Sequence, residues 1–318
     1  PMTENPWEGR PVLITGGAGF IGSNLAERLL KEGAKVRILD DFSTGRRENL
    51  EGLDAIEVIE DSVVDVETCR AACDGVDVVF HQAALPSVSR SVADPLGSHA
   101  AAATGTLNIL CAARESGARR VVYASSSSAY GNTPTLPKQE EMPTSPRSPY
   151  AVSKLAGEMY ARAFSEVYGF TTVSLRYFNI FGKRQDPNSL YSAVIPVFIQ
   201  AALEGKAPSI EGDGLQTRDF THIDNAVSAN LLAATAPVEN VTGRVFNVGA
   251  GSRTSVLALW SMIKELTGSD VDAQHVAPRP GDVQDSLADI QAAADAFGYE
   301  ASVTLSEGLA RTIAHMRG

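Results

Sequence analysis

A glycine-rich turn near the start of the chain constrains the fold more than any other feature. It reads Gly16-Gly-Ala-Gly19-Phe-Ile-Gly22 and lies between two periodic segments. The apolar run 11–15 before it indicates a buried strand, and residues 23–32 after it have the periodicity of a helix. A second apolar run, 35–39, ends in Asp40. This order of strand, glycine turn, helix, strand and acid predicts a βαβ unit that binds a dinucleotide.

Each part of this unit has a separate task in dinucleotide binding. The glycines allow a tight turn, a close approach of the backbone to a pyrophosphate, and close packing of helix on strand. The helix N-terminus offers free N–H groups to the same anion. A carboxylate at Asp40 would accept the adenosine ribose hydroxyls and repel a 2′-phosphate, which favours NAD over NADP. Arg46 and Arg47 lie nearby and keep NADP open as an alternative.

The alternation of strands and helices continues along the chain. Further strands are predicted at 55–59, 76–80, 119–125 and 171–177, and long helices at 94–116 and 150–168. This spacing predicts the α/β class, with a doubly wound parallel sheet whose ligands bind beyond the carboxyl ends of the strands. We expect a Rossmann domain at 10–178 and a smaller α/β substrate-binding lobe at 179–318, of which 218–250 returns to the sheet.

Tyr150 and Lys154 stand four residues apart, so on a helix they lie on one face, one turn from each other. An ammonium group there would lower the pKa of the phenol and let Tyr150 act as a base near neutral pH. The serines Ser125–Ser128 end the strand expected at 119–125, where their hydroxyls could bond a substrate alcohol and share its proton with Tyr150. His81 follows another strand, and we expect it to pack or to bond a loop rather than to catalyse.

Composition excludes several classes of partner. The formal net charge of −11 over 318 residues argues against nucleic acid and anionic membranes. No apolar run reaches the roughly 18 residues of a membrane span, and the first ten residues lack the apolar segment of a signal peptide. Cys69, Cys73 and Cys111 form neither a disulfide framework nor a metal set. We therefore expect a cytoplasmic protein without a metal.

These motifs together resemble the extended short-chain dehydrogenase/reductase family over nearly the whole chain. The resemblance rests on the glycine turn, the serine run and Tyr150-x-x-x-Lys154. Within that family the chain looks most like the NAD-dependent nucleotide-sugar 4-epimerases. Three segments are similar to the UDP-N-acetylglucosamine 4-epimerases in particular: Arg176-Tyr-Phe-Asn-Ile-Phe-Gly182, Arg184-Gln-Asp-Pro-Asn188 and Ser286-Leu-Ala-Asp-Ile290.

The resemblance implies three sets of site residues. In the catalytic set, Tyr150 is the base, Ser126 assists it, and Lys154 bonds the nicotinamide ribose. The NAD-binding set is Gly16, Gly19, Phe20, Ile21, Gly22, Asp40, Asp41, Phe42, Ser43, Thr44, Gly45, Asp61, Ser62, Gln82, Ala83, Ala84, Ala124, Ser125, Tyr150, Lys154 and Tyr177. The sugar-nucleotide set is Ser87, Ser126, Ser127, Ser128, Tyr150, Asn179, Ala193, Val194, Arg218, Arg279 and Ser286, in which Asn179, Arg218 and Arg279 hold the diphosphate and nearby groups.

The implied reaction is 4-epimerisation of a UDP-sugar through a transient 4-keto sugar. Ser286 matches a position where a tyrosine in related enzymes restricts the pocket to plain hexoses, so UDP-GlcNAc and UDP-GalNAc are favoured beside UDP-Glc and UDP-Gal. A UDP-glucuronate 4-epimerase and a non-catalytic NAD sensor stay open. So does a dehydratase, although that class resembles Thr-Asp-Glu where this chain has Ser126–Ser128.

The chain departs from the family pattern at two positions. Ala102 stands where relatives often have an asparagine that supports the active-site helix and the nicotinamide loop, and Pro86 stands in the loop over the sugar. Relatives dimerise by joining two helices of each chain into a four-helix bundle. The matching helices here are 94–116 and 150–168, so we expect a homodimer through outer residues such as Ala101, Ala103, Ala156 and Ala161.

Overall fold

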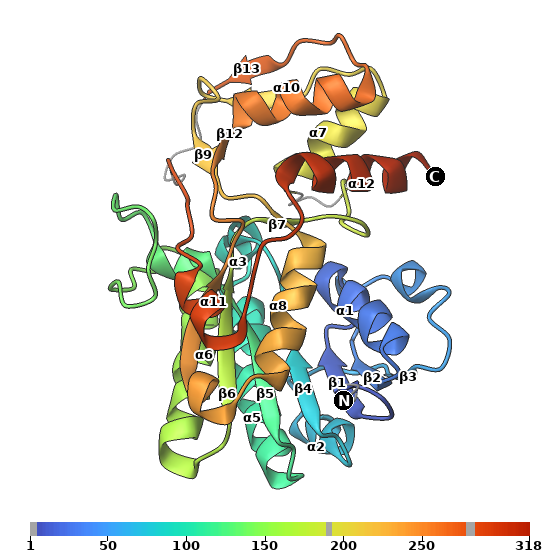
Figure 1. Ribbon diagram of the computed structural model, residues 1–318, viewed down its shortest axis with the longest axis vertical. Helices are drawn as coiled ribbons and strands as arrows, with labels where there is room; N and C mark the ends of the chain where they lie inside the picture. The colour runs from blue at the N-terminus through green and yellow to red at the C-terminus, as the bar shows by residue number, and fades with distance from the viewer. Residues whose placement is uncertain (1–4, 189–192, 278–283) are drawn as a thin grey trace.

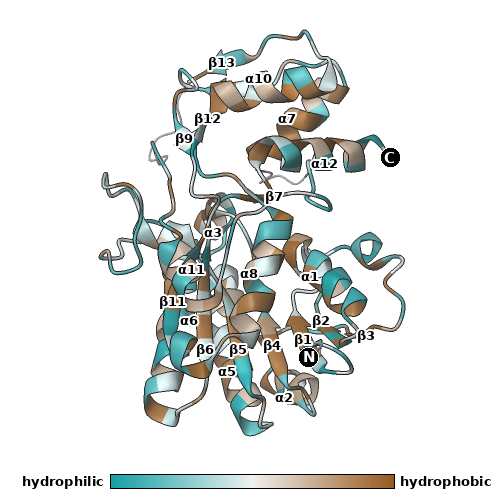
Figure 2. Ribbon diagram, in the orientation of Figure 1, coloured by the Kyte–Doolittle hydropathy of each residue, from teal (hydrophilic) through white to brown (hydrophobic). Residues whose placement is uncertain are grey.

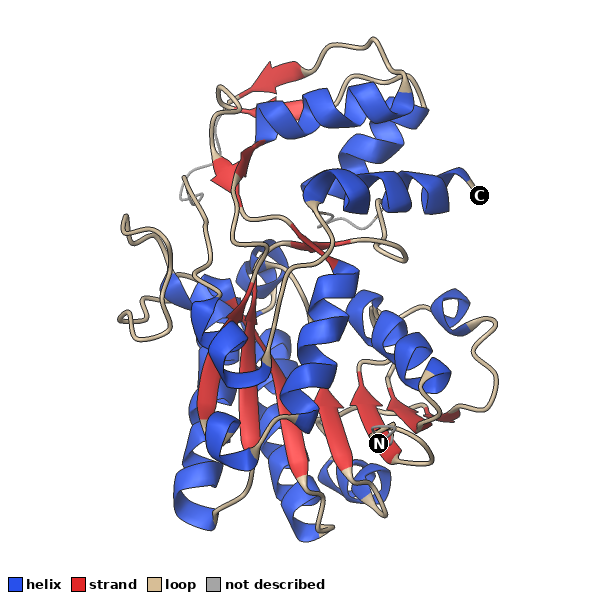
Figure 3. Ribbon diagram, viewed as in Figure 1, coloured by secondary structure: helices blue, strands red, loops and turns tan. Residues whose placement is uncertain are grey.

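A seven-stranded sheet forms the centre of the computed structural model, which describes residues 5–188, 193–277 and 284–318 (Figures 1 and 3). The strand order is β11-β6-β5-β4-β1-β2-β3, and every neighbouring pair is parallel. The strands are β1 (Pro11–Thr15), β2 (Lys35–Leu39), β3 (Glu57–Ile59), β4 (Val78–His81), β5 (Arg120–Ser126), β6 (Thr172–Tyr177) and β11 (Arg244–Val248). The predicted doubly wound α/β fold is confirmed.

Helices cover both faces of the sheet, which explains why its strands are apolar on both sides (Figure 2). In β1, Val12 and Ile14 point to one apolar core and Leu13 to the other, because side chains alternate along a strand. The first core contains α1 (Phe20–Lys31), α8 (Ile223–Thr235) and α11 (Gln291–Phe297). The second contains α2 (Val66–Cys73), α5 (Gly105–Glu115) and α6 (Pro149–Tyr168).

A smaller group of elements lies beyond the carboxyl ends of the strands (Figure 1). It comprises α7 (Val194–Leu203), α10 (Val256–Thr267), α12 (Leu305–Arg317), β8 (Ser209–Glu211) and β13 (Gln274–Val276). These elements enclose an apolar core of their own, which includes Phe198, Trp260 and Leu309. A separate core means that this group can present its own wall to a ligand lying on the sheet.

Short elements complete the described chain. They are α3 (Val88–Ala93), α4 (Pro95–His99), α9 (Val238–Val241), the 3₁₀ turns η1 (Arg47–Leu50) and η3 (Ser127–Tyr130), and the π-helical turn η2 (Ala100–Thr104). Three two-stranded ladders pair β7 (Ile180–Phe181) with β10 (Thr221–His222), β9 (Thr217–Arg218) with β12 (Thr254–Ser255), and β8 with β13.

Two elements differ from the sequence-based expectation. The helix predicted at 94–116 is interrupted, because the π-helical turn η2 separates α4 from α5. The strand predicted at 55–59 begins only at Glu57, since Ala55 has a φ of 65°, which a strand residue does not adopt. Both differences arise from backbone geometry that apolar periodicity does not encode.

Residues after 218 contribute to the sheet as well as to the smaller group. β11 pairs in parallel with β6, with Phe246 opposite Leu175, and α8 packs on the same face as α1. The domain limits 10–178 and 179–318 stay a prediction. Within the three described ranges, no helix combines the length and the hydropathy that crossing a membrane requires.

Candidate active site

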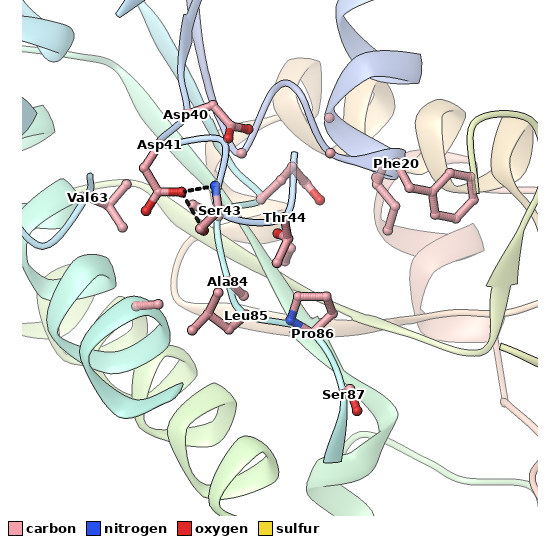
Figure 4. Close-up of a pocket in the computed structure, with 18 of the residues that line it drawn as sticks. Phe20, Asp40, Asp41, Ser43, Thr44, Val63, Ala84, Leu85, Pro86 and Ser87 are labelled. Atoms are coloured by element: carbon pink, nitrogen blue, oxygen red, sulfur yellow. Dashed lines mark hydrogen bonds between the residues drawn. The ribbon is translucent and has the colours of Figure 1, made fainter. Parts of the chain in front are cut away.

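A cavity of about 650 Å³ opens beyond the carboxyl ends of β1, β2, β4 and β5 (Figure 4). Figure 4 shows Asp40 and Asp41 on one side of it, and the segment Ala84 to Ser87 on another. Every residue of the predicted NAD-binding set lines this cavity except Phe42 and Gly45. The cavity also reaches Tyr150 and Lys154, so one space connects the glycine turn with the predicted catalytic residues.

The three glycines occupy three different environments. Gly16 has a φ of +67°, and a Cβ there would lie 2.8 Å from the backbone of Ala83. A Cβ on Gly22 would lie 2.2 Å from the carbonyl oxygen of Gly16, whereas on Gly19 it would meet only that oxygen, at 3.2 Å. Gly19 therefore leaves the cavity side open where α1 begins, as the backbone approach to a pyrophosphate requires.

Asp40 is held in place by the backbone around it. Its Oδ2 accepts from Ala18 N at 2.8 Å and its Oδ1 from Phe42 N at 2.9 Å. Each carboxylate oxygen keeps a second lone pair for a ribose hydroxyl. Burial raises the pKa of Asp40 above its ordinary value, and these two hydrogen bonds offset part of that rise. A Cβ on Gly45 would lie 2.6 Å from Oδ1, so Phe42 and Gly45 shape this carboxylate rather than line the cavity.

The two arginines that left NADP open are matched by carboxylates. Arg46 lies 3.6 Å from Glu48 and from Asp186, and Arg47 lies 2.6 Å from Glu60. Only Arg46 of the two lines the cavity. The charge that would attract a 2′-phosphate is thus already balanced, which agrees with the carboxylate of Asp40.

Tyr150 and Lys154 lie in the first turns of α6, which begins directly after the N-cap Ser148. Lys154 Nζ donates to the backbone oxygen of Ala124 at 2.6 Å, and burial lowers the pKa of Lys154 to about 7. Burial also raises the pKa of Tyr150, which a hydrogen bond with Ser126 partly offsets. Among the protein's own groups, burial thus outweighs the Ser126 hydrogen bond, and the lowering of the phenol pKa expected from Lys154 and the positive nicotinamide stays a prediction.

The serine run divides between the strand end and the turn after it. Ser125 lines the cavity, and its Oγ donates to Glu158 Oε2 at 2.8 Å. Ser126 Oγ accepts from the backbone N and the hydroxyl of Ser128, at 3.2 and 2.9 Å. Ser126, Ser127 and Ser128 lie beside the cavity rather than in its wall. Ser126 is thus oriented by the η3 turn while it bonds Tyr150.

The predicted sugar-nucleotide residues fall into two groups. Ser87, Tyr150 and Ala193 line the cavity, and Val194 is the first residue of α7 beside it. Asn179, Arg218 and Ser286 lie outside its wall. Arg279 falls outside the described residues.

The backbone of residues 217–219 connects this second group. Asp219 accepts hydrogen bonds from the backbone N of Ala250, Gly251 and Ala288, and its own carbonyl accepts from Asn179 Nδ2 at 3.1 Å. Ser286 N donates to Thr217 O at 3.1 Å, and Arg218 donates to the same oxygen at 2.9 Å. Burial raises the pKa of Asp219 to about 6, although the hydrogen bonds from the three backbone N–H groups lower it in part. Asn179, Arg218 and Ser286 therefore lie on one hydrogen-bonded support.

Several cavity residues were not assigned to either ligand set from the sequence. They are Leu39, Arg46, Asn49, Val63, Leu85, Pro86, Arg90, Ala101, Arg184, Gln185 and Asp186. The last three belong to the segment Arg184–Asn188, a polar loop that resembles the 4-epimerases but was not assigned a ligand. It is fixed to α1 by Glu27, which lies 2.6 Å from Lys183 and 2.9 Å from Arg184. Burial raises the pKa of Glu27, but its hydrogen bonds to Lys183 and Lys31 outweigh this and lower it to about 2.

A dinucleotide cleft with a tyrosine–lysine pair at its inner end is the site of a short-chain dehydrogenase-like enzyme. The family model described as the NAD dependent epimerase/dehydratase family matches residues 12–249, and the chain belongs to this family. NAD is the cofactor, as the sequence predicted. The glycine turn and Asp40 would hold its pyrophosphate and adenosine ribose, and Lys154 the nicotinamide ribose.

Known relatives cover almost the whole chain. UDP-glucose 4-epimerase from Mycolicibacterium smegmatis is 39% identical over 310 residues, 96% of this chain and 98% of that protein. UDP-N-acetyl-alpha-D-glucosaminuronate decarboxylase from Bacillus cytotoxicus is 37% identical over 270 residues, 83% of this chain and 82% of that protein. The solved UDP-N-acetylglucosamine 4-epimerase from Methanobrevibacter ruminantium M1, in complex with UDP-N-acetylmuramic acid, superposes with a TM-score of 0.93 at 37% identity, covering 98% and 99% of the two chains.

Proposed function

We propose that this chain is an NAD-dependent UDP-sugar 4-epimerase that interconverts UDP-GlcNAc and UDP-GalNAc, and also UDP-Glc and UDP-Gal. The observation that carries the proposal is that Tyr150 lines the same cavity as the glycine turn and that its hydroxyl is hydrogen-bonded to Ser126. Two of the relatives described above are 4-epimerases of UDP-sugars. An isomerase of this kind needs one group that removes and returns a single proton, and Tyr150 is placed to do so.

Some of these residues transfer the proton of the sugar 4-hydroxyl, and others retain the 4-keto sugar in the site. NAD, when bound, supplies the acceptor and donor of hydride at C4. Tyr150 takes the proton of the sugar 4-hydroxyl while Ser126 orients the phenol, and C4 becomes a carbonyl. The 4-keto sugar turns about its phosphate linkage, so that hydride would return to the opposite face of C4, and Tyr150 returns the proton to the 4-oxygen. The reaction has no net redox change, so binding of the diphosphate must keep the keto sugar from leaving.

The diphosphate would be held by the second group of residues. Arginine side chains can neutralise it through bidentate hydrogen bonds, and Arg218, Arg279 and Asn179 are assigned to it by resemblance to the family. The support for this assignment is that Asn179 donates to the carbonyl of Asp219 while Arg218 and Ser286 both donate to the carbonyl of Thr217, so the three share the backbone segment 217–219. The acidic net charge does not oppose it, because local arginines outweigh a distant field.

Small residues favour an N-acetylated sugar. Ser286 is half-buried beside Arg218, and Ser87 and Ala193 line the cavity, so none of these side chains fills the space of an acetamido group. The ligand of the Methanobrevibacter neighbour is itself N-acetylated. A bulky residue at position 286 would close that space.

A 4-epimerase acting on UDP-glucuronate is the second candidate. A uronate needs a cation for its carboxylate, and Arg90 lines the cavity three residues after Ser87. The decarboxylase relative also acts on an acidic sugar nucleotide by its name. The two 4-epimerases described above are named for UDP-glucose and UDP-N-acetylglucosamine, which are not uronates, and this places the candidate second.

The decisive experiment offers UDP-GlcNAc, UDP-Glc and UDP-glucuronate to the purified protein, with and without NAD, and follows the anomeric protons by NMR. We expect the 4-epimer of UDP-GlcNAc to form fastest. Faster conversion of UDP-Glc or of UDP-glucuronate would overturn the proposed preference for UDP-GlcNAc but would still support 4-epimerisation. Tyr150→Phe should lose turnover and keep NAD, whereas a non-catalytic NAD sensor would show no turnover before the change.

We also propose that the chain forms a homodimer through the face of α3, α4 and α6. Ala103 and Ala161, expected at that face, are instead buried in their own chain. Larger apolar side chains are exposed there: Leu96 by 82%, Val92 by 66% and Val152 by 51%. Val152→Glu should shift the sedimentation coefficient to that of a monomer, and Val197→Glu on α7 of the smaller lobe should not. A wild-type protein that sediments as a monomer would overturn the proposal.

A further inference from the structure

A continuous chain of hydrogen bonds runs beneath the cofactor cavity. Ala83 N donates to Thr15 Oγ1 at 3.2 Å, and Thr15 Oγ1 lies 2.6 Å from His81 Nδ1. On the other side of the ring, His81 Nε2 lies 2.9 Å from Thr106 Oγ1, which donates to the backbone oxygen of Ala102. The side chains of Thr15, His81 and Thr106 are buried, so water does not compete for these bonds.

The two ends of the chain fix every proton in it. The Thr106 hydroxyl donates its single hydrogen to Ala102 O, so its oxygen must accept from His81 Nε2–H. A neutral imidazole that donates at Nε2 accepts at Nδ1, so Thr15 must donate to it, which leaves Thr15 Oγ1 free to accept from Ala83. All five groups are satisfied only by the neutral Nε2–H tautomer of His81. Protonation at Nδ1 would leave the Thr15 hydrogen without an acceptor in this chain.

The surroundings of His81 favour the neutral ring. Burial lowers the pKa of His81 to about 3, and the charge of Lys154 adds to this. The imidazole stacks on Tyr123 at 5.8 Å between ring centroids, and the Tyr123 hydroxyl donates to Lys154 O at 2.9 Å. The Tyr123 hydroxyl also lies near Thr106, but its hydrogen is donated to Lys154 O, so it cannot donate to Thr106. Whether the Thr106 hydrogen points to Ala102 O or to the Tyr123 oxygen, Thr106 Oγ1 still accepts from His81 Nε2–H.

The chain connects two walls of the cavity. Ala83 lines it together with Gln82 and Ala84. The backbone of Ala83 packs so closely against Gly16 that a Cβ on Gly16 would lie 2.8 Å from it. Ala102 belongs to the π-helical turn η2, whose neighbour Ala101 also lines the cavity. The methyl group of Ala102 cannot form a hydrogen bond to the loop at Ala83, so the hydrogen-bonded connection between these two walls passes through His81.

We propose that His81 is a positioning residue: its neutral Nε2–H tautomer ties the π-helical turn at Ala102 to the amide of Ala83, and so fixes the wall of the cavity that receives the nicotinamide half of NAD. His81 itself does not line the cavity. The part of the inference that concerns NAD stands on the cofactor cleft, and only its effect on turnover rests on the proposed epimerase function.

Thr106→Val tests the proposal, because it keeps the shape of the side chain and removes only the hydroxyl. We expect NAD to bind at least about fivefold more weakly, as the loss of one buried hydrogen bond allows, and Thr106→Ser to restore wild-type affinity. Leu110→Ala on α5 is the control: it opens a cavity in the core below the sheet without touching the chain, so it should lower thermal stability and leave NAD affinity unchanged. Affinity is measured calorimetrically on protein stripped of NAD, well below each melting temperature.

A merely structural role would give a different pattern. If Thr106→Val lowered the melting temperature while its NAD affinity stayed within twofold of wild type, the positioning role would be overturned, whatever sugar the enzyme accepts. Nitrogen-15 NMR of labelled histidine gives an independent check, with the resonances assigned by their loss in His81→Asn. We expect a protonated Nε2 and an unprotonated Nδ1, and the Nδ1–H tautomer or an imidazolium at neutral pH would also overturn the proposal.

Discussion

Lys154 donates from Nζ to the backbone oxygen of Ala124, 2.6 Å away at the carboxyl end of β5. The same amine lies 5.2 Å from the ring centroid of Tyr123. Neither partner carries a negative charge, so burial lowers the pKa of Lys154 to about 7 and only part of the amine is charged at neutral pH. Further positive charge must therefore come from the ligand if Tyr150 is to ionise near pH 7.

The titration of Tyr150 tests this conclusion. In protein stripped of NAD, we expect the phenol to ionise above its ordinary pKa of about 10, because burial dominates. Oxidised NAD should lower that pKa, since its nicotinamide ring is positive, and Ser126→Ala should raise it by removing a stabilising hydrogen bond. The measurement is the ultraviolet absorbance of phenolate, taken as the difference between wild type and Tyr150→Phe because the chain has eight tyrosines. Ionisation below pH 10 without NAD would mean that Lys154 suffices alone.

The buried ion pair of Arg176 and Glu158 gives a stability prediction. Arg176 Nη2 lies 2.5 Å from Glu158 Oε1, and the two side chains are 2% and 4% exposed. Glu158→Gln leaves a buried arginine without its counter-charge, which should cost about 3–5 kcal/mol in urea unfolding. Replacing both, as Glu158→Met with Arg176→Leu, should cost less than either single change, because no buried charge is left. A double variant less stable than both single variants would contradict this prediction and would show that the ion pair stabilises the fold relative to an apolar pair.

Gly19 and Gly22 should respond differently to alanine. A Cβ on Gly22 would lie 2.2 Å from Gly16 O, so Gly22→Ala must shift α1 or the turn and should cost about 1–3 kcal/mol of stability. Gly19 is the N-cap of α1 with φ −76° and ψ 176°, which alanine adopts without strain. Gly19→Ala should therefore keep the fold and bind NAD at least about tenfold more weakly, because its methyl group takes pyrophosphate space. Unchanged NAD affinity in Gly19→Ala would contradict the assigned role of this turn.

The parts that could be predicted from the sequence are those with a local signal. The glycine turn, Asp40 and the pair Tyr150 and Lys154 each depend on residues within one turn or one βαβ unit, so spacing alone identifies them. The loop at 184–186 lines the cavity next to the long-range ion pair of Arg184 with Glu27 of α1, which spacing does not encode.

Long-range contacts explain the remaining differences. Thr15 and Thr106 lie 66 and 25 residues from His81, so no local pattern predicts that the three share one hydrogen-bonded chain. The raised pKa of Tyr150 has the same origin, since burial is a property of the packed structure. Ala102 could be recognised as a departure from relatives, but the bonds that replace its missing side chain required the fold.

His81 should also make the protein sensitive to acid. Its pKa is about 3 in the folded chain against 6.5 when unfolded, so below pH 6.5 the unfolded state takes up a proton that the folded state refuses. This stability is complete above pH 6.5 and is lost as the pH falls toward 3, with a loss of about 2 kcal/mol between pH 7 and pH 5.

Asp219 acts in the opposite direction over the same range, so the two groups must be separated. Its pKa is raised from 3.8 to about 6, and the cost of its buried charge disappears as the pH falls through 6. We expect about 1 kcal/mol of compensation from it between pH 7 and pH 5. In urea unfolding at these two pH values, His81→Gln should therefore lose less stability on acidification than wild type, and Asp219→Asn should lose more. Equal losses in His81→Gln and wild type would mean that the imidazole accepts a proton in the folded protein, which the neutral hydrogen-bonded chain through Thr15 and Thr106 forbids.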